Sequence, residues 1–299
     1  MPHHFETGHP GEPKLTRQTS EELRKGMEKA VKLFCKEFSV DGKEQIRQVL
    51  RENPNAKFVL AASHFSNLDA PAAVVALGDM LDMQITAESV LFEGLAPQRA
   101  LFKFAGKENF VPLSYEKGKK GKHGVFDPDD FTGLAQSVEK GKTPWIAIHP
   151  FTKEEQMQAA RIGSVYLAHK SGAMIIPAAL EYEGGSVSME GGIELAKALA
   201  ARVAGKGKGT YHVGKPIQLL PLDVSIIETV MYKRGNKEQV TDEERVEFSR
   251  VYKRLKEDAN TVASKIGTML PPERRGQYQE IPEIELGEDD IEMVEEEVK

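Results

Sequence analysis

The sequence predicts an α/β protein with a mixed central sheet flanked by helices. Short apolar runs, such as residues 58–62 and 175–179, alternate along the chain with longer amphipathic segments such as residues 27–35. This alternation is typical of a sheet whose strands are connected by helices, with active groups on loops at the strand ends. With 299 residues, of which 40% are hydrophobic, the chain is long enough to bury a sizeable core.

The elements follow in order from the N-terminus. An amphipathic pattern predicts the first helix, at 19–36. The apolar run at 58–62 predicts a buried strand at 57–62, which is followed by a predicted alanine-rich helix at 70–82. The other predicted helices cover 43–53, 95–105, 131–140, 156–171, 191–203 and 242–268. The other predicted strands cover 37–41, 84–88, 109–113, 144–148, 173–180 and 210–213.

The two ends of the chain differ from its body. Residues 1–18, with three His and three Pro, and residues 277–299 are expected to be disordered, while residues 19–276 are expected to form one α/β domain with a helical N-terminal flank and a C-terminal helix. Glu280 to Lys299 contain ten acidic residues and one Lys, a net charge of −9. Because the whole chain carries −6, the preceding 279 residues carry +3 and are mildly basic.

The sequence also bears on location and partners. No stretch reaches the roughly 18 apolar residues of a membrane span, and the N-terminus lacks the apolar core of a signal peptide, so a cytoplasmic location is expected. The single Cys35 cannot form an intramolecular disulfide and is interpreted as a buried core thiol. No metal and no nucleic-acid partner are expected.

The most informative motif is His64 followed five positions later by Asp69, directly after the apolar run 58–62. A turn between this strand and the next helix can bring the carboxylate back onto the imidazole. A carboxylate on one ring nitrogen fixes the tautomer, so that the other nitrogen can take a proton from a hydroxyl near neutral pH. The pair is therefore predicted to be catalytic, with His64 as general base and Asp69 orienting it.

The surrounding sequence resembles the glycerolipid acyltransferase family, the lysophosphatidic acid and glycerol-3-phosphate acyltransferases that carry a His-x-x-x-x-Asp motif. Further blocks with the order and spacing of that family are found at 38–44, 106–113, 134–142, 145–150, 163–168, 175–179 and 211–217. The resemblance covers about residues 36 to 220. It implies a glycerol-3-phosphate acyltransferase-like fold and transfer of a fatty acyl group from acyl-CoA or an acyl carrier protein to a hydroxyl.

Two departures from the family pattern concern the acceptor. The third block of the family reads Phe-Pro-Glu-Gly-Thr-Arg, whereas this chain has His149-Pro150-Phe151-Thr152-Lys153. The Arg that usually ends the second block is also missing, since Ser114 follows Leu113. By resemblance both missing groups bind the phosphate of the acceptor, and Pro150, Thr152 and Lys153 are the remaining candidates for that site.

A glycine-spaced basic loop follows the second block. Its Lys117, Lys119, Lys120 and Lys122 are interpreted either as a solvated surface, as a phosphate site, or as a contact for anionic lipid headgroups on the inner face of the membrane.

Other candidates lie near the motif. Ser66 and Asn67 are expected to contact substrate, and backbone amides near Ser66 or after Pro150 are candidate donors to an oxyanion. His149 is either a second polar group in the pocket or a structural histidine. Residues 90–104 form either an acyl-lining element or ordinary core.

Two classes of function stay open. The first is an O-acyltransferase that needs no cofactor, with the acyl thioester as co-substrate and a glycerolipid or non-phosphorylated alcohol as acceptor. The second is a non-catalytic, acyltransferase-like protein that binds lipid. The intact His64 and Asp69 favour the enzyme.

Overall fold

The computed structural model describes residues 18–88, 109–113, 128–152, 155–184, 187 and 192–279. The predicted helix at 95–105, the basic loop at 117–122, Lys153 and most of the two predicted disordered ends lie outside these residues.

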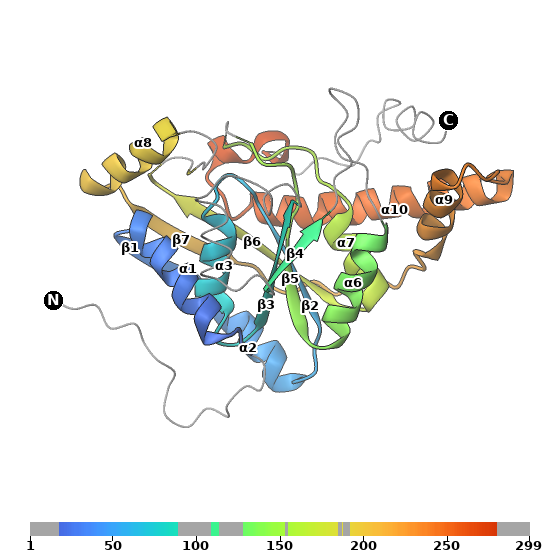
Figure 1. Ribbon diagram of the computed structural model, residues 1–299, viewed down its shortest axis with the longest axis horizontal. Coiled ribbons are helices and arrows are strands. Elements are labelled where there is room, and N and C mark those ends of the chain that lie inside the picture. The colour runs from blue at the N-terminus through green and yellow to red at the C-terminus, as the bar shows by residue number, and fades with distance from the viewer. Residues whose placement is uncertain are drawn as a thin grey trace.

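Within the described chain, seven strands form one sheet in the order β1-β7-β6-β2-β5-β3-β4 (Figure 1). Neighbouring strands are parallel except for β6 and β7, which are antiparallel. The strands are β1 (Glu37–Asp41), β2 (Phe58–Ala62), β3 (Asp82–Glu88), β4 (Phe110–Leu113), β5 (Lys142–Ala147), β6 (Met174–Tyr182) and β7 (Lys208–Val213). The prediction of an α/β fold with a mixed central sheet flanked by helices is confirmed.

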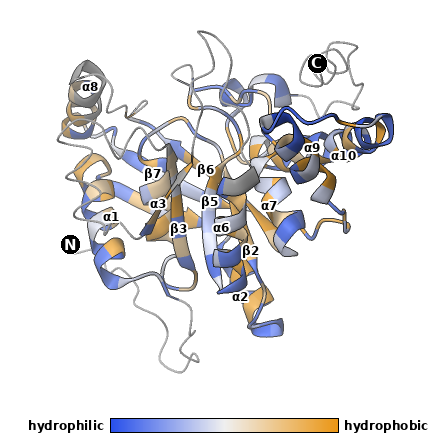
Figure 2. Cartoon of the chain, turned by 45° about the vertical axis from the view of Figure 1, so that its right-hand side comes forward, coloured by the Kyte–Doolittle hydropathy of each residue, from blue (hydrophilic) through white to orange (hydrophobic). Residues whose placement is uncertain are grey.

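Helices cover both faces of the sheet. Apolar side chains of α1 (Glu21–Phe34), α2 (Lys43–Glu52) and α3 (Asp69–Leu77) form one core with one face of the sheet. Those of α6 (Pro128–Glu139), α7 (Gly163–Ser171), α9 (Ser225–Gly235) and α10 (Asp242–Gly267) form a second core with the other face. The remaining helix, α8 (Gly192–Val203), lies beside α1. Figure 2 shows polar residues gathered over α9 and the adjoining end of α10.

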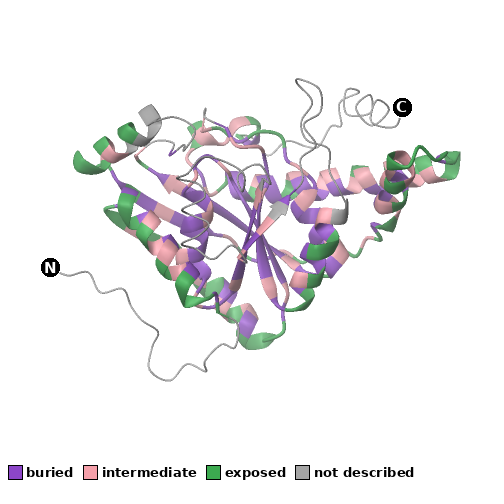
Figure 3. Ribbon diagram, viewed as in Figure 1, coloured by how far each residue is buried: buried purple, intermediate pink, exposed green. Residues whose placement is uncertain are grey.

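Strand β2 lies in the middle of the sheet, and all five of its residues are buried (Figure 3). It pairs in parallel with β6 on one side and β5 on the other. A strand covered on both faces and both edges reads as a continuous apolar run, which is why residues 58–62 were recognisable in the sequence. The residues that follow β2 therefore start from a rigid position at the carboxyl edge of the parallel strands.

The predicted helix at 156–171 is wrong in its first half, because α7 begins only at Gly163. Backbone groups before it bind distant partners instead: the N–H of Met157 donates to Arg274 O (3.0 Å), and that of Arg161 donates to Ile148 O (2.7 Å). Glu155 also has a positive φ of 54°. These tertiary hydrogen bonds outweigh the local preference for helix in this segment.

Other elements differ at their ends or had no prediction. Helix α3 ends at Leu77, before the predicted residue 82, and β3 already begins at Asp82. No pattern predicted α9, or the short 3₁₀ helices Pro272–Arg274 and Gly276–Tyr278. Tyr278 is buried and its hydroxyl bonds Asn260, so the ordered chain runs past the predicted boundary at residue 276.

Gly42 is required at the turn between β1 and α2. Its φ is +81°, and a Cβ there would lie 1.9 Å from the carbonyl oxygen of Val213. Only glycine combines this backbone conformation with so close an approach.

In the described part of the chain, no helix has both the length and the apolar character needed to cross a membrane.

Candidate active site

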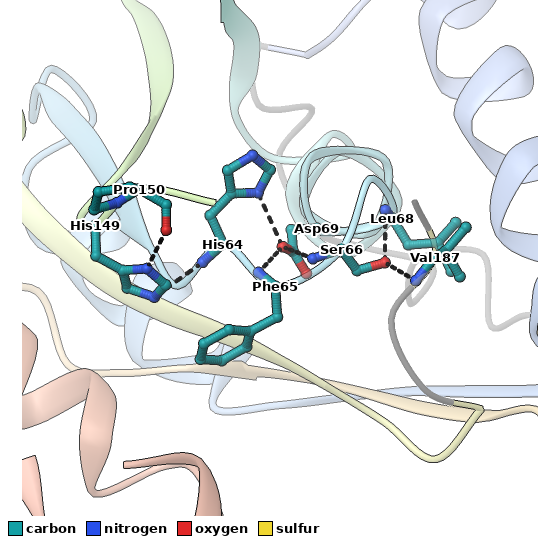
Figure 4. A network of polar contacts seen from close by, with 8 residues as sticks. All are labelled: His64, Phe65, Ser66, Leu68, Asp69, His149, Pro150 and Val187. Carbon is teal, nitrogen blue, oxygen red and sulfur yellow. Dashed lines mark hydrogen bonds and ion pairs between the residues drawn. The ribbon is translucent and has the colours of Figure 1, made fainter. Parts of the chain in front are cut away.

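His64 and Asp69 meet in the loop that joins β2 to α3, at the carboxyl edge of the sheet (Figure 4). The Nδ1 atom of His64 lies 3.1 Å from Oδ2 of Asp69. Asp69 is the first residue of α3 and is 1% exposed, whereas the His64 side chain is 24% exposed. One end of the pair is thus fixed in the protein and the other reaches solvent.

The carboxylate of Asp69 is held by the loop it closes. The backbone N–H groups of Phe65 and Ser66 both donate to the same Oδ2, each at 2.8 Å. Burial raises the pKa of Asp69, and this effect is opposed by the His64 imidazole and by the two backbone N–H groups, all of which favour the ionised form. Because Oδ2 is fixed by the backbone, the His64 ring is oriented by a rigid partner.

The tautomer of His64 follows from this contact. An ionised carboxylate accepts hydrogen bonds only, so Nδ1 carries the proton and Nε2 presents its lone pair. Nε2 makes no hydrogen bond with the described residues, and its ring is partly open to solvent. A hydroxyl group that reaches Nε2 could therefore give up its proton there.

Aromatic side chains enclose the His64 ring. Trp145, in β5, meets it edge to face with 5.4 Å between ring centroids, and Phe151 does so at 5.2 Å. These walls are apolar and limit the directions from which water can approach the imidazole. No sequence pattern singled out either residue, since a tryptophan in a strand reads as core and Phe151 stood in a block that departs from the family.

His149 is completely buried and bonds through both ring nitrogens. Its Nδ1–H donates to the carbonyl of Pro150 (2.7 Å), and its Nε2 accepts the backbone N–H of His64 (3.2 Å). Burial lowers the pKa of His149 to about 4, so the ring is neutral near pH 7. Of the two interpretations open from the sequence, this geometry favours the structural histidine, because the ring holds the backbone of His64.

Ser66 is also turned into the protein. Its hydroxyl oxygen accepts the N–H groups of Leu68 (3.1 Å) and Val187 (3.3 Å) and so closes the loop. Asn67 is half-buried, and its backbone N–H donates to Val187 O at 2.8 Å. In the structure Ser66 therefore holds the loop together through hydrogen bonds within the protein. Its contact with substrate stays a prediction.

The remaining residues of the third block lie against His64. The N–H of Thr152 points to the carbonyl of His64 at 3.4 Å, and Thr152 is 9% exposed. Pro150 is half-buried and supplies the carbonyl that holds His149. Lys117, Lys119, Lys120 and Lys153 lie outside the described residues.

Two further groups near the site carried no sequence signal. Tyr211 of β7 is completely buried, and the negative charge of Asp69 adds to burial in raising the pKa of its phenol, which places the two side chains in one buried region. The charge of Arg161 helps to lower the pKa of His149, so a guanidinium lies near the end of β5. Both come from segments distant in sequence, which a motif cannot reveal.

The buried Cys35 lies elsewhere, in the core with α1, and burial raises the pKa of its thiol to about 11. This supports its interpretation as a core residue. Among the described residues, no group of three or more His, Cys, Asp and Glu side chains is placed to hold a metal ion.

Comparison with known proteins returns little. No protein-family model and no curated protein matches the sequence. Among solved structures, the crystal structure of the 1-acyl-sn-glycerophosphate (LPA) acyltransferase PlsC from Thermotoga maritima aligns with a TM-score of 0.43 and 14% identity, over 81% of this chain and 78% of that chain. What this chain does is therefore inferred from its own residues.

Proposed function

We propose that this chain is an O-acyltransferase that moves a fatty acyl group from an acyl thioester to a hydroxyl of a glycerolipid precursor. The observation that carries the proposal is the contact between His64 Nδ1 and Asp69 Oδ2 at 3.1 Å, with Nε2 left open at the carboxyl edge of the sheet. A histidine base can activate a hydroxyl for several reactions. We choose acyl transfer among them because the sequence blocks have the order of the glycerolipid acyltransferase family.

The reaction follows from the tautomer. Nε2 of His64 takes the proton of the acceptor hydroxyl as its oxygen attacks the thioester carbonyl carbon. The resulting oxyanion collapses, the carbon–sulfur bond breaks, and the leaving thiolate takes the proton back from His64. Asp69 stabilises the imidazolium between these two steps, because its charge is fixed 3.1 Å away.

The oxyanion requires a donor, and most of the amides first considered are occupied. The N–H groups of Phe65 and Ser66 bind Asp69, and that of Asn67 binds Val187 O. The backbone N–H of Phe151 makes no hydrogen bond among the described residues, and its side chain lies against the His64 ring. We assign the oxyanion contact to the Phe151 N–H.

Two classes of acceptor fit the sequence. Lysophosphatidic acid or glycerol-3-phosphate would require a phosphate site, for which Thr152, Lys153 and the basic loop with Lys117, Lys119 and Lys120 are the candidates. The missing Glu-Gly of the third block and the missing Arg of the second instead favour an alcohol without phosphate, such as a monoacylglycerol. The chemistry at His64 is the same for both.

The test is release of free thiol by the purified protein. Long-chain acyl-CoA and an acylated acyl carrier protein serve as donors, each with lysophosphatidic acid, glycerol-3-phosphate, a monoacylglycerol or no acceptor. We expect thiol release that depends on one acceptor, is abolished in His64→Ala and survives in His212→Ala, which removes a histidine that pairs with Glu181 instead. Equal release by His64→Ala, or none with any donor and acceptor, would overturn the proposal and favour a lipid-binding protein.

A further inference from the structure

A basic groove lies on α10, and none of its lining residues belongs to the loop that carries His64. It is lined by Arg250, Lys253 and Arg254 of α10 and by the segment 220–222 before α9, and it has a volume of about 430 Å³. One acidic residue, Glu257, also lines it. Cations therefore outnumber carboxylates among the residues that line the groove, which favours an anionic ligand there.

The three cations differ in whether they already form an ion pair within the protein. Arg250 pairs with Glu247 at 2.6 Å and Arg254 with Asp258 at 3.2 Å, each within α10. Lys253 is exposed and makes no ion pair within the described part of the chain. Its ammonium group is thus available to an external carboxylate.

The groove is also apolar on one side. Leu220 is 70% exposed, one of the most exposed large apolar side chains among the described residues, and Pro221 and Leu222 flank it. An isolated exposed leucine needs no explanation, but one that lines a groove beside cations fits a ligand with both carboxylates and aliphatic side chains.

The chain itself provides such a segment. The eleven residues from Glu280 to Asp290 contain Ile281, Ile284 and Leu286 between six acidic residues and carry no cation.

The last described residues set the distance that this segment must span to reach the groove. The hydroxyl of Tyr278 donates to Oδ1 of Asn260 on α10 at 3.1 Å. The backbone of Tyr278, however, lies beside Gly267 at the end of α10, where its carbonyl oxygen is 3.6 Å from the Cβ position of that glycine. Gly267 lies fourteen residues after Lys253, or about 21 Å along the helix axis. Seven extended residues after Gln279 span about 23 Å, so the part of the segment from Leu286 to Asp290 can reach the groove.

We propose that the acidic segment Glu280–Asp290 docks into this groove within the same chain, with its carboxylates on Lys253, Arg250 and Arg254 and its aliphatic side chains on Leu220. Individual exposed ion pairs are weak, yet tethering gives the segment a local concentration of the order of millimolar. The contact is electrostatic in large part, and salt should therefore release it.

The experiment uses the full chain and a zero-length carbodiimide reagent, which joins an amine to a carboxylate in contact with it. We expect an amide between Lys253 and a carboxylate of Glu280–Asp290, located by mass spectrometry, whose yield falls at least about fivefold in about 0.5 M NaCl. A mixture of isotopically light and heavy chains should give cross-links within chains of one label only.

A matched pair of variants tests the site. Arg250→Gln/Arg254→Gln should reduce the Lys253 cross-link, whereas Arg47→Gln/Arg51→Gln, which removes two arginines from α2, should leave it intact. Circular dichroism checks that each variant is folded. If a variant does not fold, the salt response of the unmodified chain still tests the contact. Cross-links spread over many lysines, no salt response, or amides between light and heavy chains would overturn the proposal. None of these readouts depends on acyl transfer.

Discussion

The imidazole of His149, at the end of β5, accepts the backbone N–H of His64, at the end of β2, across 3.2 Å. The other ring nitrogen of His149 donates to Pro150. Two loops from adjacent strands are thereby joined through one neutral ring, directly beside the residue that we propose as the base.

This junction predicts a pH dependence of stability. The pKa of His149 is about 4 in the folded protein against an ordinary value of 6.5, so between these pH values the unfolded chain binds a proton that the folded chain does not. The stabilising contribution is complete above pH 6.5 and is lost as the pH falls toward 4, up to about 3 kcal/mol in total. Urea unfolding measured from pH 7 to pH 4 should show this loss.

The control is His149→Gln, which cannot take up a proton. Its free energy of unfolding should be lower than that of the unmodified protein at pH 7 and should fall less steeply toward pH 4. The same slope in both proteins would show that other groups cause the acid sensitivity.

Asp69→Asn should remove activity and keep the fold. The amide oxygen can still accept the N–H groups of Phe65 and Ser66, but a neutral amide does not stabilise the imidazolium of His64. We expect kcat for thiol release to fall by about 10²- to 10⁴-fold with a small change in KM. Asp79→Asn, which weakens the ion pair of Asp79 with Lys43, should keep normal kcat, and a similar loss there would contradict the assignment.

A second buried pair should matter for stability and leave catalysis intact. His169 of α7 contacts Asp258 of α10 at 2.8 Å, with 2% and 10% of the two side chains exposed. Asp258→Ala leaves the imidazole without its partner and should cost about 3 kcal/mol of unfolding free energy. Glu247→Ala, in the exposed pair with Arg250, should cost less than about 0.5 kcal/mol. Equal costs in urea unfolding would show that burial of the first pair is unimportant.

Two glycines with positive φ allow the cost of backbone strain to be compared with the cost of steric overlap. Gly172 has φ +63° with no atom within 4 Å of an added Cβ, whereas Gly42 has φ +81° and the Val213 carbonyl at 1.9 Å. Gly172→Ala should therefore cost about 1 kcal/mol, and Gly42→Ala clearly more. Thermal unfolding of both variants provides the comparison. Equal shifts in Tm would show that overlap with the Val213 carbonyl adds nothing to the cost of the substitution.

The parts of this molecule that could be predicted from the sequence are those set by residues close together in the chain. A buried strand reads as an apolar run, and the spacing from His64 to Asp69 is set by one loop, so both were predictable. The segment 156–162 has helical propensity but is held by Arg274 and Ile148, and the surroundings of His64 come from Trp145 and Phe151. Such partners are chosen by the packed fold, and no local pattern records them.

Strand β2 is hydrogen-bonded to strands on both sides and buried along its whole length, and the loop with His64 continues directly from it. Central strands exchange their amide hydrogens through opening of the entire domain, whereas edge strands open locally. The residue that we propose as the base, His64, is therefore attached to the part of the fold that should unfold last. Catalytic competence and cooperative unfolding should accordingly share one midpoint in denaturant, with no inactive, folded intermediate between them.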